Sequence, residues 1–86
     1  MSIYDFLKAE RLKRNISIRK FAKLCNISNS TMADYENKRL TPSIKSLLKI
    51  SEALNIDIFN ILKNTTYLEE INEGQYVWYK NKRHET

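Results

Sequence analysis

Apolar residues recur at helical spacing through the first two-thirds of the chain, and the first such segment opens at its N-terminus. Ile3, Leu7 and Leu12 follow one another with Phe6 alongside, and Ser2 with Asp5 three residues later is a typical start signal for a helix. The pattern predicts a first helix from about Ser2 to Arg14.

Serine and aspartate mark the starts of four more helices, because their side chains can accept a hydrogen bond from a free N–H of the first turn. Ser17 is expected to cap a second helix and Ser28 a third. Pro42 and Ser43 begin a fourth, and Asp57 caps a fifth that reaches about Lys63. The residues expected on the inner faces of helices two to four are Phe21, Ala22, Cys25, Met32, Tyr35, Leu47, Ile50 and Leu54.

Asparagines stand where helices one, two and four should end. Asn15, Asn26 and Asn55 can adopt the left-handed conformation that terminates a helix, which asparagine tolerates best among residues other than glycine. Short connections follow these ends, and no strand-like run occurs before Asn64. The fold class predicted is therefore all-α, a compact bundle of five helices.

From Asn64 onward the pattern changes. A short sixth helix is expected from the capping-box pair Thr66 and Glu69, from the spacing of Tyr67, Leu68 and Ile71, and from Gly74 as its stop. A single β-strand is expected next, from the β-favouring run Tyr76, Val77, Trp78 and Tyr79. A charged tail, Lys80 to Thr86, follows it.

The net charge of +5 is spread unevenly along the chain. Residues 1–63 carry +6 and residues 64–86 carry −1. A basic surface attracts polyanions over a long range and releases their counterions on binding. The charge distribution therefore favours a polyanionic partner for the first two-thirds of the chain.

Several function classes find no support in the sequence. Cys25 and His84 are the single cysteine and histidine, too few for an internal disulfide or a metal site, and no glycine-rich phosphate loop occurs. No nucleophile and base are paired, so we expect no enzyme, no metal and no cofactor. No run of about 20 apolar residues and no secretory leader is found, so a cytoplasmic protein without a membrane partner is expected.

Residues 16–37, from Ile16-Ser17-Ile18-Arg19 to Tyr35-Glu36-Asn37, resemble the helix-turn-helix of the phage Cro and repressor type, the Xre family. The likeness continues through Thr41-Pro42-Ser43 to Leu62. Asn15, Asn26 and Asn55 occupy positions where the family has glycine. The resemblance implies a DNA-binding domain over residues 1–63, with residues 64–86 as a C-terminal extension. It also implies a scaffold salt bridge between Arg11 and Glu36, which we favour over contact of this pair with DNA.

The resemblance makes the third helix the recognition helix, whose N-terminal residues read base edges in the major groove. The candidates for base reading are Asn29, Ser30, Ala33 and Asp34. Phosphate contacts are expected at helix starts and in the loop after the third helix. The candidates for these contacts are Ser17, Arg19, Lys38, Arg39, Ser43 and Lys45.

Three positions depart from the family pattern. Ile18 replaces a phosphate-binding glutamine and could serve packing or a protein contact. Lys38 stands where glycine is usual. Asp34 would repel phosphates, although it could accept a hydrogen bond from cytosine or pair with a neighbouring cation.

A domain of this type reads only a half-site, so a homodimer on a pseudo-palindrome of double-stranded DNA is expected. Tyr76 to Tyr79 is the candidate dimerisation strand, because an isolated strand needs a partner and a second copy could supply it. Trp78 and Tyr79 could instead pack on the fifth helix or, less favoured, stack on bases. The sequence thus predicts a transcriptional repressor of a bacterium or its phage. The rival hypothesis is an antitoxin or phage-type adaptor that binds a protein partner through the aromatic segment.

Overall fold

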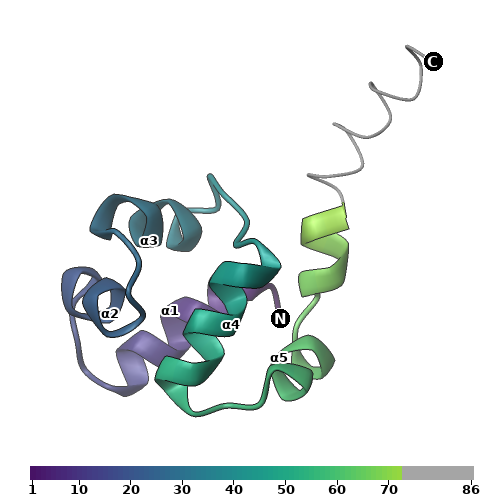
Figure 1. Cartoon of the computed structure of the whole chain (residues 1–86). Helices are drawn as coiled ribbons and strands as arrows, with labels where there is room; N and C mark the ends of the chain where they lie inside the picture. The colour runs from purple at the N-terminus through teal and green to yellow at the C-terminus, as the bar shows by residue number, and fades with distance from the viewer. Residues whose placement is uncertain (73–86) are drawn as a thin grey trace.

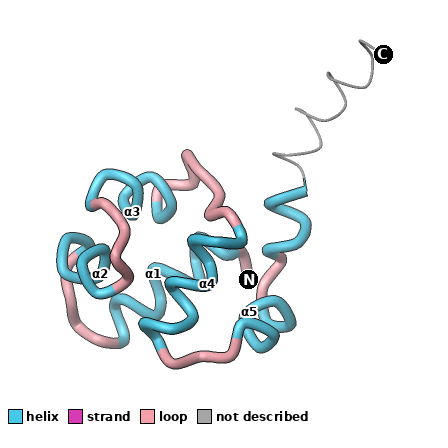
Figure 2. Tube along the Cα trace, viewed as in Figure 1, coloured by secondary structure: helices cyan, strands magenta, loops and turns pink. Residues whose placement is uncertain are grey.

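The computed structural model describes residues 1–72, which fold as five helices followed by a further helical segment at residues 67–72 (Figure 1). The helices are α1 (Ile3–Lys13), α2 (Ile18–Leu24), α3 (Asn29–Glu36), α4 (Ile44–Leu54) and α5 (Ile58–Asn64). Loops alone join them, and residues 1–72 contain no strand (Figure 2). The predicted all-α class is confirmed. The expected strand at residues 76–79 lies outside the described residues.

Each of the five helices begins at the predicted cap. The side chains of Ser2, Ser17, Ser28 and Ser43 accept from the backbone N–H three residues later at 3.1 to 3.2 Å. Asp57 accepts from the N–H of Phe59 at 3.2 Å. These bonds satisfy N–H groups that have no partner inside the helix, and each cap typically stabilises a helix by about 1 kcal/mol.

The chain turns in the left-handed conformation at four residues among those described. Asn15, Asn26 and Asn55 have φ values of 55°, 57° and 55°, as their places at helix ends predict. Lys38, in the loop after α3, has a φ of 62°. Lysine pays a steric penalty there that glycine would not, because its Cβ crowds the carbonyl oxygen.

The core lies between the helices, with α2 packed on α3, α3 on α1, and α4 on α5. All eight residues expected on the inner faces of the second to fourth helices are buried. Leu12 lies in α1 as predicted but outside the core, because 58% of it is exposed. It follows Leu7 by five residues, about 140° around the helix, so the two cannot share the buried face.

The 67–72 helix packs on the same core through Tyr67, which is fully buried. Thr66 N–H donates to the carbonyl of Met1 at 2.8 Å, and Ile3 N–H donates to Glu70 Oε1 at 2.9 Å. Glu70, which also bonds the Thr66 hydroxyl, replaces the predicted Glu69, because it alone reaches the start of α1. The expected stop at Gly74 lies outside the described residues.

No helix within residues 1–72 has the length and apolar character needed to cross a membrane.

Candidate nucleic-acid interface

The outer face of α3 carries the four candidates for base reading. Asn29 and Ser30 are exposed, while Ala33 and Asp34 are half-buried. On the opposite side of the helix, Met32 and Tyr35 are buried in the core, 0% and 3% exposed. This division leaves a face of short polar and small side chains open to solvent, with the side-chain amide of Asn29 at its N-terminal end.

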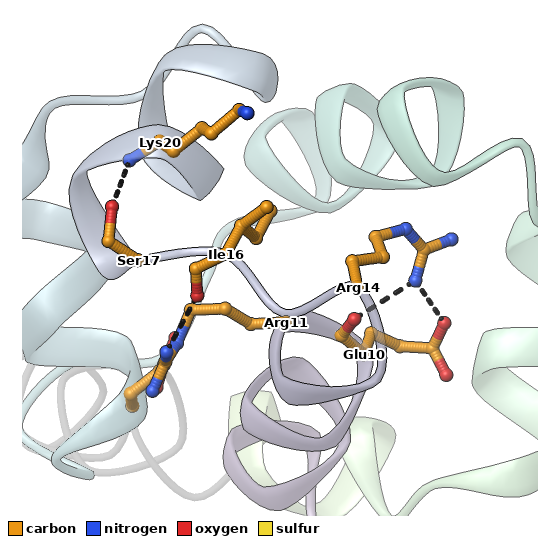
Figure 3. Close-up of polar contacts among 7 residues, drawn as sticks. Glu10, Arg11, Arg14, Ile16, Ser17 and Lys20 are labelled. Atoms are coloured by element: carbon orange, nitrogen blue, oxygen red, sulfur yellow. Dashed lines mark hydrogen bonds and ion pairs between the residues drawn. The ribbon is translucent and has the colours of Figure 1, made fainter.

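The start of α2 holds two of the phosphate candidates. Ser17 Oγ accepts from the N–H of Lys20 at 3.1 Å (Figure 3), and Arg19 is exposed. Ile18 is half-buried and packs against the core. Packing accounts for an apolar side chain at this departure from the family pattern.

The loop between α3 and α4 supplies two exposed cations, and each faces a carboxylate of its own chain. Lys38 Nζ lies 3.8 Å from Asp5 Oδ1, with both side chains more than half exposed. Arg39 Nη1 lies 3.9 Å from Asp34 Oδ1. Asp34 therefore pairs with a neighbouring cation in the free protein, and Arg39 lies beside the outer face of α3.

The start of α4 follows that loop directly. Ser43 Oγ accepts from the N–H of Ser46 at 3.1 Å and caps the helix, and Lys45 is exposed in its first turn. Free N–H groups and the helix dipole make such a terminus a favourable place for a phosphate oxygen.

Arg11 and Glu36 are brought together between α1 and the end of α3. Arg11 Nε donates to both carboxylate oxygens of Glu36, at 3.0 and 2.8 Å, and the two side chains are only 14% and 4% exposed. Arg11 also donates to the carbonyl of Ile16 at 3.0 Å (Figure 3). One guanidinium thus ties α1 to the end of α3 and to the chain that enters α2, which fixes the position of α3 in the domain.

Sequence reasoning missed most of the long-range polar contacts of the domain, and three of the missed contacts lie near the candidate interface or the end of α4. Arg14 bonds the side chain of Glu10 at 2.8 Å (Figure 3) and the carbonyl of Leu54 at 3.4 Å, joining α1 to the end of α4. Thr41 and Pro42, in the α3–α4 loop, form hydrogen bonds with the hydroxyls of Tyr4 and Tyr67. No local pattern marks these contacts, because the partners lie 25 to 40 residues apart in sequence.

Cys25 and Tyr67 are shielded from ionisation. Burial raises the pKa of the Cys25 thiol to about 11, although the positive charge of Arg14 acts in the opposite direction. Burial, and then the nearby Tyr35, raise the pKa of Tyr67 to about 12. The thiolate is the nucleophilic form of cysteine, so Cys25 is an inert member of the core near neutral pH.

The candidates for dimerisation, residues 76–79, lie outside the described residues. The division of the chain at residue 63 into a domain and an extension stays a prediction. Residues 66–70 of the extension contact both the start of α1 and the core.

The sequence profile of the helix-turn-helix family matches residues 7–60, well over half of the chain. The ImmF control region 10 kDa protein of Bacillus phage phi105 is 33% identical over 70 residues, 81% of this chain and 76% of that protein. The immunity repressor protein of the same phage is 31% identical over 70 residues, again 81% of this chain but 49% of the repressor.

Another relative comes from Methanococcus vannielii and is named as an HTH-type transcriptional regulatory protein. It is 33% identical over 66 residues. Those residues are 77% of this chain but 20% of that protein. The chain thus corresponds to a fifth of one relative and about half of another. With the profile match and the relatives taken together, this chain belongs to the helix-turn-helix family of DNA-binding transcriptional regulators of the phage Cro and repressor type.

Proposed function

We propose that this protein is a repressor that binds a pseudo-palindromic operator in double-stranded DNA as a homodimer. In this proposal α3 of each copy lies in a major groove, with Asn29, Ser30, Ala33 and Asp34 toward base edges. The observation that carries it is the outer face of α3, which is open to solvent and polar while its other side is locked into the core.

The phosphate contacts belong to the surroundings of that face. Arg39 lies beside Asp34, so the α3–α4 loop brings a cation close to the groove that α3 would enter. Ser17 and Ser43 cap helices whose first N–H groups can meet a phosphate, and Arg19, Lys38 and Lys45 add exposed positive charge. Lys38 and Arg39 would exchange their present carboxylate partners for phosphates on binding.

The mode of action proposed is occupancy of DNA in the cytoplasm of a bacterium, without catalysis. The immunity repressor among the relatives supports repression rather than activation. The protonated state of Cys25 and its burial support a role for that residue in packing alone.

Selection of binding sites from a pool of randomised duplexes, followed by a salt series on the selected site, tests the proposal. We expect a pseudo-palindrome with half-sites about one helical turn apart, and affinity that falls steeply with salt. Weak binding without any enriched sequence would contradict the operator proposal. It would instead favour the adaptor hypothesis, for which capture of a protein partner is the next experiment.

A further inference from the structure

The α3–α4 loop is anchored by two tyrosine hydroxyls that come from opposite ends of the described sequence. The hydroxyl of Tyr4, in α1, lies 2.6 Å from Thr41 Oγ1. The hydroxyl of Tyr67, in the 67–72 helix, donates to the carbonyl of Pro42 at 2.6 Å. Two neighbouring residues of one loop are therefore each fixed by a hydrogen bond from a distant element.

Of the two bonds, the one from Tyr67 is buried. Tyr67 and Pro42 both lie in the core, so the carbonyl of Pro42 has no water to replace its donor. A buried carbonyl that loses its partner bears the full desolvation penalty, whereas an exposed one does not. The loop conformation is thus tied more strongly to Tyr67 than to any exposed contact.

The other polar contacts of this loop either hold only its start or are weak. The N–H groups of Lys38 and Arg39 donate to the carbonyls of Tyr35 and Asp34 at 3.1 and 2.9 Å, which fixes the start of the loop to the end of α3. The pairs of Lys38 with Asp5 and of Arg39 with Asp34 span 3.8 and 3.9 Å between exposed side chains, and such pairs contribute little to stability. Lys38 also holds an unfavourable φ of 62°. The later part of the loop, toward the cap of α4, therefore depends on the hydrogen bonds of Thr41 and Pro42 with the two tyrosines.

The position of Tyr67 itself is fixed by the start of the chain. Its neighbours Thr66 and Glu70 bond the carbonyl of Met1 and the N–H of Ile3, and the N-terminus lies beside the 67–72 helix (Figure 1). Tyr67 N–H donates to Thr65 Oγ1 at 3.3 Å. A displacement of this helix would therefore disturb the hydrogen bond to Pro42, one residue before the cap of α4.

We propose that Tyr67 is a positioning residue for DNA binding, through which the helix after α5 holds the α3–α4 loop and the start of α4 in their DNA-contacting arrangement. The proposal rests on the proposed function. It adds that Tyr67, a fully buried residue beyond the five helices, sets how strongly the phosphates are held.

Tyr67→Phe tests this link, because it removes the hydroxyl and keeps the buried ring. Ile61→Val is the matched control, since it trims another fully buried side chain while leaving both hydroxyl contacts of the loop intact. Tyr4→Phe removes the second hydroxyl at a half-buried site, where the variant is expected to fold. Each variant is compared with the wild type on the selected operator and on an unrelated duplex across a salt series, after circular dichroism has shown that it is folded.

For Tyr67→Phe we expect Kd to rise about five-fold on both duplexes, with sequence preference unchanged. The slope of log K against log salt, which is negative, should become less steep by roughly one half to one. Tyr4→Phe should act in the same direction, and Ile61→Val should change neither quantity. A hydroxyl that served stability alone would leave the salt slope of the folded protein unaltered. The hydrogen-bonded amides of Lys38, Arg39 and Ser46 should also exchange hydrogen faster in Tyr67→Phe, while those of α2 keep their protection.

The proposed role of Tyr67 would be overturned if the wild type binds the operator and Tyr67→Phe has the same affinity and salt slope as Ile61→Val. That outcome would leave the proposed function standing. A wild type that binds no DNA would overturn both. If Tyr67→Phe does not fold, the decision passes to Tyr4→Phe, and an unchanged salt slope in that variant rejects the anchoring of the loop by its hydroxyl contacts.

Discussion

Asn29 begins α3 and Arg39 follows that helix in the loop, and the two side chains bring different chemistry to DNA. The amide of Asn29 has both a donor and an acceptor, which can match the two groups of an adenine edge. The guanidinium of Arg39 is 74% exposed and offers only charge and donors, which suit any phosphate. One side chain should therefore determine sequence preference and the other overall affinity.

Asn29→Ala should weaken binding to the selected operator by about 1 to 3 kcal/mol and relax preference at one base position of each half-site. Arg39→Ala should weaken binding to all duplexes and lower the salt slope by about one. Titration of both variants onto the operator and an unrelated duplex, across a salt series, separates the two roles. Identical behaviour of the variants would show that the roles are wrongly assigned.

Lys38 is a candidate for phosphate contact whose backbone conformation is unfavourable for stability. Its φ of 62° costs a residue with a Cβ roughly 1 to 2 kcal/mol, and glycine would avoid that cost. Lys38→Gly should therefore raise the free energy of unfolding by about 0.5 to 1 kcal/mol, after allowance for the greater freedom of glycine in the unfolded chain. Urea unfolding measures the change.

The matched control for Lys38→Gly is Lys8→Gly, the same substitution in the exposed middle of α1, where glycine should lower stability by about 1 kcal/mol. Lys38→Gly should also bind DNA more weakly, because one phosphate candidate is lost. A variant that is less stable than the wild type would contradict the cost assigned to this backbone conformation.

At the scale of the elements, sequence predicted best what depends on neighbours in the chain. The caps Ser17, Ser28 and Ser43 were predictable because a cap and the N–H groups it serves lie within three residues. The ends at Asn15 and Asn26 follow from the conformational preference of one residue type.

Contacts between distant elements escaped prediction. Nothing adjacent to Tyr67 indicates that its hydroxyl reaches Pro42, and nothing near Arg14 indicates Leu54. Arg11 and Glu36 are separated by 25 residues and were expected together through family resemblance alone.

Cys25 makes the helix-turn-helix sensitive to alkaline pH. The thiol has an ordinary pKa of 9.0 in the unfolded chain and about 11 in the fold, where burial disfavours the thiolate. A group whose pKa is raised on folding supports the fold fully below the unfolded value, and this support is lost as pH rises through the folded value. Stability should therefore fall between about pH 9 and 11.

The difference in free energy of unfolding between the wild type and Cys25→Ala isolates this effect, because the other groups that titrate in the same range are common to both proteins. The wild type should be the more stable at pH 8, since alanine leaves unfilled space. Its advantage should shrink by about 2 to 3 kcal/mol as the pH approaches 11. Urea unfolding at pH 8, 9, 10 and 10.5 provides the test, and a constant difference would contradict the assignment of the raised pKa to burial of the thiol.

For the whole molecule, the limiting quantity is the length of DNA that one copy can read. The eight residues of α3 extend only about 12 Å, enough for a few base pairs. Two copies on a pseudo-palindrome double the contacts, and the second copy binds at a high effective concentration once the first is in place. The positive charge of residues 1–63 would then be presented twice along one face of the duplex.

If residues 76–79 join the proposed homodimer, changes in this aromatic run should alter DNA affinity but not base preference. Replacing Trp78 and Tyr79 by alanine should remove the apolar anchors of the association, and the loss of such anchors typically costs 2 kcal/mol or more, about a thirty-fold weaker dimer. Lys80→Ala, a polar change next to this segment, is the matched control and should leave association intact. Sedimentation equilibrium measures the dimer, and operator titrations measure its consequence.

The double variant should need a correspondingly higher concentration to fill the operator, while its binding to an isolated half-site stays that of the wild type, because α3 and the loop are untouched. A variant that still sediments as a dimer would assign association to other residues. A wild type that remains monomeric both free and on the operator would remove the homodimer from the proposal and leave each copy to bind its half-site alone.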